Sequence, residues 1–179
     1  GAPTVIWLNR DAAPVAGGTS TTVAWQTLKQ AAPVLKLSQE ALAATRLNRL
    51  HEQGEGVIIA QFEQIVDGIE VFGRTLNIAL TRDLRPIGVT GGLSATVEST
   101  STTFALPSTE AVSAALARMT GAGTVITPGD PRGGDSRYQA HQFAAFNAGG
   151  TRVHMASQPR SKQVFFPAKK ELIPAYYIE

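Results

Sequence analysis

The pattern of hydrophobic and polar positions between residues 56 and 92 predicts a β-hairpin. Two apolar runs rich in β-branched side chains, Val57–Val66 and Ile69–Leu80, are separated only by Asp67 and Gly68. An Asp-Gly pair between such runs is typical of a type I′ turn, because both central residues of that turn need a positive φ. The sequence therefore predicts two antiparallel strands joined at Asp67-Gly68.

Side chains in the two predicted strands alternate between faces, with one change of face. In the first run, which only Gln64 interrupts, the apolar residues on one face are Ile58, Ala60, Phe62 and Val66. In the second run one face has Ile69 and Val71, and the other has Leu76, Ile78 and Leu80. A bulge near Phe72-Gly73 would absorb this change. Residues 82–86 are expected to turn into a third strand, Ile87–Thr90, which completes an antiparallel meander.

The segment before the hairpin predicts a strand and two helices. Val5–Leu8 is interpreted as a strand or docked arm, followed by a linker. Thr21 or Thr22 is expected to cap a helix, and Ser38 a second, shorter one. The apolar residues near one face of the first helix are Trp25, Leu28, Ala32 and Leu35. Residues 45–51 alternate only partly, so periodicity alone does not decide their structure.

The segment after the meander begins with a Ser/Thr-rich stretch, residues 94–103, interpreted as an exposed strand or connector. Ser108 is expected to cap a helix that ends at Gly121. Its apolar positions are Val112, Ala115, Leu116 and Met119. Residues 129–134 are expected to form a loop, and residues 139–147 either a helix or a strand. Three further strands are expected at Thr151–Ser157, Gln163–Phe166 and Leu172–Ile178.

Composition is that of an ordinary globular protein. The 179 residues are 43% hydrophobic and 17% charged, and 16 basic against 14 acidic residues give a net charge of +2. This charge is too small to indicate nucleic-acid or membrane binding. Basic residues near aromatic ones between 152 and 177 are interpreted as a solvated face over core aromatics. No apolar run reaches the roughly 18 residues of a membrane span.

No residue set predicts catalysis, metal binding or a cofactor. The nearest match to a zinc-protease helix begins at His51-Glu52, but its fifth position is Glu55 where a second histidine is needed. His141 and His154 have no second histidine nearby. The chain has no cysteine and no serine in a nucleophile-elbow context. We therefore expect no catalytic residue, no metal ligand and no cofactor.

The meander nevertheless resembles a known family. The string from Phe62 to Gly73, FEQIVDGIEVFG, with Leu76, Ile78 and Val89-x-Gly91 after it, resembles the propeptide domain of fungalysin- and thermolysin-type zinc metallopeptidases. Glu70 stands where that family usually has proline, and Arg74 where it usually has a second glycine. The resemblance implies that the structural residues of the motif are Asp67, Gly68, Val71, Phe72, Gly73 and Gly91.

A second resemblance covers the rest of the chain. The helix opening Ser-Thr-Glu-Ala at 108–111, the run Val164-Phe165-Phe166-Pro167 and the segment 169–176 resemble the PepSY-like portion that follows the first motif in fungalysin-type propeptides. The two matches together cover roughly residues 22–92 and 106–179. They favour a strand at 45–51. In the family further strands follow, so Leu172–Ile178 is expected to lie at a sheet edge.

The resemblance implies an α+β fold of two cystatin-like lobes, each a helix packed on an antiparallel β-sheet. Residues 1–20 would be an arm and linker, 21–104 the fungalysin/thermolysin-propeptide-like domain, and 105–179 the PepSY-like domain, incomplete at its C-terminus. The resemblance also implies a function for the chain: a non-catalytic propeptide that acts as intramolecular chaperone and inhibitor of a secreted zinc metallopeptidase.

The implied partner is the cognate metallopeptidase catalytic domain, with no nucleic acid and no membrane, in a secreted or periplasmic setting. Val66, Ile69 and Phe72 are the candidate contacts with that domain, because they flank the predicted turn. A free-standing secreted protease inhibitor or binding module of the same fold is the alternative, because a fold does not determine a function. An H-E-x-x-H sequence downstream of Glu179 would favour the propeptide.

Overall fold

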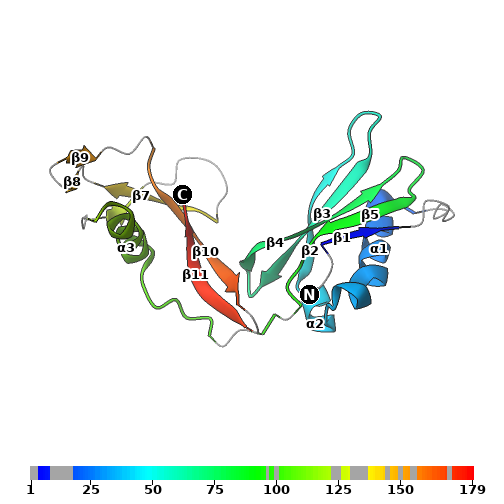
Figure 1. Ribbon diagram of the computed structural model, residues 1–179, viewed down its shortest axis with the longest axis horizontal. Coiled ribbons are helices and arrows are strands. Elements are labelled where there is room, and N and C mark those ends of the chain that lie inside the picture. Colours follow the sequence, from blue (N-terminus) through cyan, green and yellow to red (C-terminus); the bar gives the residue numbers. More distant parts are fainter. Residues whose placement is uncertain are drawn as a thin grey trace. The chain divides into compact units, whose positions relative to one another are not determined.

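The computed structural model describes residues 4–8, 18–95, 97–98, 101–121, 126–129, 137–143, 146–148, 151–153, 157–168 and 171–179. The chain divides into two compact units. Unit 1 comprises Gly1–Ser99 with Pro167–Leu172, and unit 2 comprises Thr100–Phe166 with Ile173–Glu179. Each combines helix with antiparallel strands, so the fold is a mixture of α and β structure (Figure 1).

Unit 1 is an antiparallel sheet with two helices. Its elements are β1 (Val5–Trp7), α1 (Ser20–Leu35), α2 (Gln39–Ala43), β2 (Thr45–His51), β3 (Ile58–Val66), β4 (Ile69–Leu80) and β5 (Pro86–Gly91). The strands pair in the order β1-β5-β4-β3-β2. The predicted meander and the predicted strand at Val5 are confirmed, and residues 45–51 form a strand.

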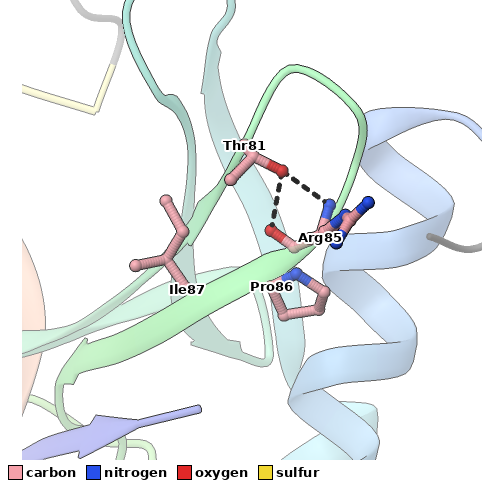
Figure 2. Close-up of a pocket in the computed structure, with 4 residues that line it drawn as sticks. All are labelled: Thr81, Arg85, Pro86 and Ile87. Atoms are coloured by element: carbon pink, nitrogen blue, oxygen red, sulfur yellow. Dashed lines mark hydrogen bonds between the residues drawn. The ribbon is translucent and has the colours of Figure 1, made fainter. Parts of the chain in front are cut away.

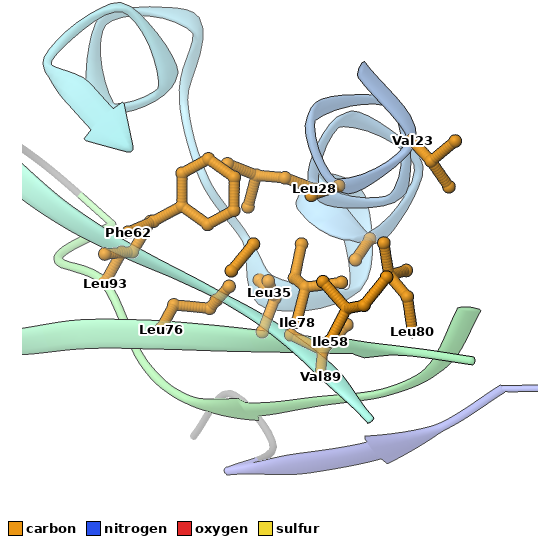
Figure 3. Packing of buried hydrophobic residues seen from close by; sticks show 13 residues of the cluster. Val23, Leu28, Leu35, Ile58, Phe62, Leu76, Ile78, Leu80, Val89 and Leu93 are labelled. Carbon is orange, nitrogen blue, oxygen red and sulfur yellow. The ribbon is translucent and has the colours of Figure 1, made fainter. Parts of the chain in front are cut away.

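The core of unit 1 lies between α1 and one face of this sheet. Side chains from the helix and from three strands form one buried cluster (Figure 3), whose members include Val23, Leu28, Leu35, Ile58, Phe62, Leu76, Ile78, Leu80 and Val89. Trp25 packs its ring edge-on against Phe62, with 4.8 Å between the centroids. Burying each large side chain contributes about 1.5–3 kcal/mol, so this helix-on-sheet contact is the main source of stability for the unit.

The two helices of unit 1 begin at residues that can cap them. Thr19 has an extended backbone, and its side chain accepts a hydrogen bond from Thr22 N at 3.2 Å. The predicted caps, Thr21 and Thr22, are therefore wrong, because both already lie in the first turn of α1. Ser38 caps α2 as predicted, accepting from Ala41 N at 3.1 Å.

A β-bulge explains why residues 45–51 alternate only partly. The pairing of β2 with β3 shifts register between Leu47 and Arg49. The extra residue, Asn48, changes the parity of the strand. Leu47 and Leu50 therefore both pack against the core although they are three positions apart.

The described residues of unit 2 form one helix and several strands. Its elements are α3 (Ser108–Thr120), β6 (Ile126–Pro128), β7 (Gln139–Phe143), β8 (Phe146–Ala148), β9 (Thr151–Val153), β10 (Arg160–Pro167) and β11 (Leu172–Ile178). β6 pairs with β7, β7 with β10, and β10 with β11, whereas β8 and β9 pair with each other. Residues 139–147 thus contribute strands, and β11 lies at a sheet edge among the described residues.

Helix α3 differs from its prediction at both the cap and the buried face. Pro107 occupies the N-cap without a side-chain hydrogen bond, and Ser108 is the first helical residue, donating from Oγ to Gln139 Oε1 at 2.6 Å. Met119 is 82% exposed and lies outside the core, because only Val112 and Leu116 are buried. Gly121, with φ of 73°, ends the helix as predicted.

Two further expectations fall partly on residues that are not described. The Ser/Thr-rich stretch contains no strand among its described residues, which fits a connector. The predicted loop at 129–134 lies outside the described residues except for Gly129. None of the helices in the described ranges combines the length and apolar character that crossing a bilayer requires.

Candidate functional site

The tip of the β3–β4 hairpin has the geometry that the Asp-Gly sequence predicts. Asp67 and Gly68 both have positive φ, 49° and 82°, as a type I′ turn requires. Val66 pairs with Ile69 across the turn. The two turn residues are exposed and the two flanking residues are half-buried. The structure thus brings two of the candidate contact residues together beside an exposed turn.

Gly68→Val is expected to destabilise unit 1 by about 1–2 kcal/mol, because a β-branched residue is strained at a φ of 82°. Steric contact contributes nothing, since no atom lies within 4 Å of a Cβ at this position. Gly56→Val is the matched control, because its site is equally open and its φ is not positive. Urea unfolding followed by tryptophan fluorescence measures both. Equal stability of the two variants would contradict the type I′ turn.

A bulge beyond the tip produces the predicted change of face. Between the pairs Glu63–Thr75 and Ile65–Glu70, the single residue Gln64 of β3 lies opposite Val71–Arg74 of β4. Gly73 has a φ of 65° within that segment. The bulge predicted near Phe72-Gly73 is confirmed.

The bulge segment gives the motif residues different exposures. Val71 is buried, Phe72 is half-buried and Gly73 is exposed. On the facing strand Ile65 is buried, whereas Val66 is only half-buried. The prediction that Val66 continues the core face of β3 is therefore wrong, because the register shift between residues 63 and 65 changes the parity.

Gln64 is a buried polar residue whose side chain connects β3 to two other segments of unit 1. Sequence reasoning did not identify this structural role. The side chain of Gln64 is fully buried. Its Nε2 donates to Ala41 O at 3.3 Å and to Ser94 O at 3.0 Å, and its Oε1 accepts from Ser94 N at 2.6 Å. The amide therefore joins β3 to α2 and to the segment after β5. Its polar character within an apolar run was the only signal in the sequence.

Gly91 is the motif glycine under the strongest steric constraint. Its φ is 89°, and a Cβ placed on it would overlap the carbonyl oxygen of Thr75. The following residue, Gly92, donates its N–H to that same oxygen at 2.9 Å. The end of β5 can therefore approach the bulge of β4 only because residue 91 has no side chain.

A hollow of about 270 Å³ lies beside the turn between β4 and β5, lined by Thr81, Arg85, Pro86 and Ile87 (Figure 2). Thr81 and Arg85 use their polar groups within the turn: Arg85 N donates to Thr81 Oγ1 and Thr81 N to Arg85 O, both at 2.9 Å. A hydrogen bond from the Thr81 hydroxyl and the nearby Arg85 guanidinium, 2.6 Å away, lower the pKa of the Asp83 carboxyl. We assign the hollow a structural role.

Within the described residues no three metal-ligating side chains come together, so the histidines there do not form a metal site of that kind. His51 is exposed at the end of β2. The adjacent Glu52 accepts a hydrogen bond from Ser20 Oγ at 2.7 Å, at the first turn of α1. His141 is fully buried in unit 2. His154 lies outside the described residues.

Basic and aromatic side chains of unit 2 pack together. Arg160 and Lys162 lie 4.9 and 5.1 Å from the ring centre of Tyr138, and Lys162 lies 5.4 Å from that of Tyr177. Lys162 is only 9% exposed, so its assignment to a solvated face is wrong. Cation–π contact explains how the ammonium group is accommodated there. Phe166, predicted to lie in the core, is 50% exposed.

No protein-family model matches this sequence, and no curated protein matches it either. The role of the chain must therefore be inferred from its own residues and contacts.

Proposed function

We propose that the chain is a non-catalytic propeptide of a secreted zinc metallopeptidase, acting as an intramolecular chaperone and inhibitor of the protease domain. One observation carries the proposal: the residues of the string that resembles fungalysin/thermolysin propeptides occupy positions where the backbone needs them. Asp67 and Gly68 form the turn, Gly73 has a positive φ within the bulge, and Gly91 permits a close approach.

The hairpin is the part of unit 1 best suited to contact a protease domain. Its turn is exposed, and the adjoining Val66, Ile69 and Phe72 are half-buried apolar residues. Half-buried apolar side chains beside an exposed turn can contact a partner while the hairpin stays folded. A type I′ turn and a paired hairpin are already ordered, so binding would cost little conformational entropy. These three residues are the proposed contacts with the cognate catalytic domain.

A propeptide role requires no catalytic chemistry from the chain itself. Within the described ranges the side chains form no cluster able to hold a metal ion. A propeptide needs a surface that a protease domain can fold against, because a template can cover apolar surface that is exposed during folding. Tethering the two domains in one chain raises their effective concentration. We propose a secreted or periplasmic setting on the same grounds of resemblance.

The finer fold proposal is that the two units correspond to two cystatin-like lobes. Unit 1 supports it with α1 packed over an antiparallel sheet. Unit 2 supports it with α3, whose buried residues Val112 and Leu116 pack with Ile178 of β11. The proposed PepSY-like region would then be built around α3, β10 and β11.

A free-standing secreted inhibitor or binding module of the same fold is the competing function, and the coding sequence beyond Glu179 separates the two. We expect an open reading frame that continues into a catalytic domain containing H-E-x-x-H, since that helix holds the zinc and the general base. A stop codon directly after Glu179 would contradict the propeptide and support the free-standing module.

A further inference from the structure

A buried histidine in unit 2 has no role in the proposed contact surface. His141 of β7 has no exposed surface, and its ring Nε2 lies 2.7 Å from the hydroxyl oxygen of Ser161 on β10, itself 1% exposed. The strands that carry them pair at Arg160–Ala140 and Ser161–Gln139, and His141 N donates to Pro159 O at 2.9 Å. The side-chain contact therefore adds to a short backbone ladder.

The other ring nitrogen, Nδ1, is buried without a hydrogen-bond partner among the described residues. A neutral imidazole has one donor and one acceptor nitrogen, so it can leave an acceptor unpaired at this position. A protonated ring carries N–H groups on both nitrogens. Protonation would therefore bury both a positive charge and an unpaired donor, and each of these opposes the folded state.

Among the described residues, no carboxylate forms an ion pair or hydrogen bond with His141, whose side-chain partner is Ser161. The strand β10 contributes two cations, Arg160 and Lys162, and the carboxylate of Glu179, which follows β11, is held by Arg160 at 2.7 Å. The tyrosines Tyr138 and Tyr177 stack on the same cations. Helix α3 carries Glu110 and Arg118, both exposed. The described residues of β6 and β7 include no charged side chain.

We propose that the His141–Ser161 pair is an acid-sensitive latch: protonation of His141 releases β7 from β10 and opens unit 2, while unit 1 keeps its fold. Burial lowers the pKa of His141 below its ordinary value. The stability from the neutral ring is therefore complete above that ordinary value, about 6.5, and falls as the pH drops below it. One linked proton raises the opening constant by up to about tenfold per pH unit.

The aromatic residues report on the two units separately. Both tryptophans, Trp7 and Trp25, lie in unit 1, and all three tyrosines, Tyr138, Tyr176 and Tyr177, lie in unit 2. The experiment is an NMR titration of the 179-residue chain, labelled on its histidine, tyrosine and tryptophan rings, from about pH 7.5 to about pH 5. We expect the tyrosine signals to shift increasingly towards unfolded positions as the pH falls from about 6.5 to about 5, while the tryptophan signals stay native.

His141→Gln tests the latch, because glutamine cannot take up a proton. Its tyrosine signals are expected to stay native at about pH 5, while the matched controls His51→Gln and His154→Gln open as the wild type does. Native tyrosine signals at pH 5 in the wild type would overturn the proposal. So would opening of His141→Gln at the wild-type pH. If that variant fails to fold, the wild-type titration of His141 decides: a pKa below the ordinary value supports the latch, and one at or above it overturns the latch.

If the chain is a propeptide, opening of the latch in acid would also release the inhibited protease. This consequence rests on the proposed function as well as on the latch. The same samples can be added to the mature cognate protease at both pH values. Opening of unit 2 without inhibition at either pH would leave the latch standing and contradict the propeptide role. Inhibition without opening would contradict the latch and leave that role standing.

Discussion

Replacing Gly91 with alanine is expected to destabilise unit 1 by about 2–6 kcal/mol. The new Cβ would overlap the carbonyl oxygen of Thr75, and a φ of 89° is strained for any residue with a side chain. Because Thr75 O is backbone and also accepts from Gly92 N, it cannot move aside without breaking that hydrogen bond. Strain and overpacking each cost about 1–3 kcal/mol.

Gly92→Ala is the matched control for this prediction. No atom lies within 4 Å of a Cβ at residue 92, and its φ is not positive. Its unfolding free energy is expected to stay within about 0.5 kcal/mol of the wild type, as is usual for surface substitutions. Urea unfolding followed by tryptophan fluorescence measures both variants. A Gly91→Ala protein as stable as Gly92→Ala would show that β5 does not approach β4 as described.

Gln64→Leu is expected to cost about 2–4 kcal/mol although it makes the β3 face wholly apolar. Leucine would leave Ser94 N and Ser94 O without their side-chain partner, whereas Ala41 O would keep the Thr45 hydroxyl as a donor at 2.8 Å. Each buried polar group left unsatisfied costs about 1–3 kcal/mol, and the added apolar burial offsets part of that total.

The matched control for Gln64→Leu is Gln61→Leu on the same strand. Gln61 is half-buried and hydrogen-bonds only to side chains, those of Asn48 and Asn77, both at 3.3 Å. These partners can turn to water, so the expected loss is below about 1 kcal/mol. Thermal unfolding compares the two. If Gln64→Leu melted at or above the temperature of Gln61→Leu, the hydrogen bonds of the Gln64 side chain would have no stabilising role.

Features set by neighbours in the chain could be predicted from the sequence. The Asp67-Gly68 turn and the Ser38 cap depend on local backbone needs, which residue types reveal directly. The Thr19 cap was missed because Thr19, Ser20, Thr21 and Thr22 are consecutive, and each of these residue types can cap a helix. The helical period predicts that Met119 lies on the buried face of α3, but that helix buries only Val112 and Leu116.

Features set by contacts between distant residues could not be predicted. The role of Gln64 depends on Ala41 and Ser94, 23 and 30 positions away. The constraint on Gly91 comes from the β4 bulge. The buried state of His141 depends on Ser161, 20 residues later. A single sequence shows residue types and spacing, so it indicated the motif positions but not these partners.

In the candidate site, too, features set by neighbouring residues could be predicted and features set by strand pairing could not. The turn and the bulge at Phe72-Gly73 were predictable, because glycine and the change of apolar parity indicate both. The different exposures of Val66, Ile69 and Val71 were not predictable, because they depend on how β3 and β4 pair around the bulge.

Inhibition in trans is the measurement that tests the proposed role most directly. The folded 179-residue chain is titrated into its mature cognate catalytic domain, with a small fluorogenic peptide as substrate and unrelated proteases as the control. We expect dose-dependent loss of cleavage, weaker than in the tethered protein because the effective concentration is lower, and almost no effect on the unrelated proteases. Full cleavage of the substrate in the presence of tens of micromolar folded chain (about −6 kcal/mol of binding or weaker) would contradict the inhibitory role.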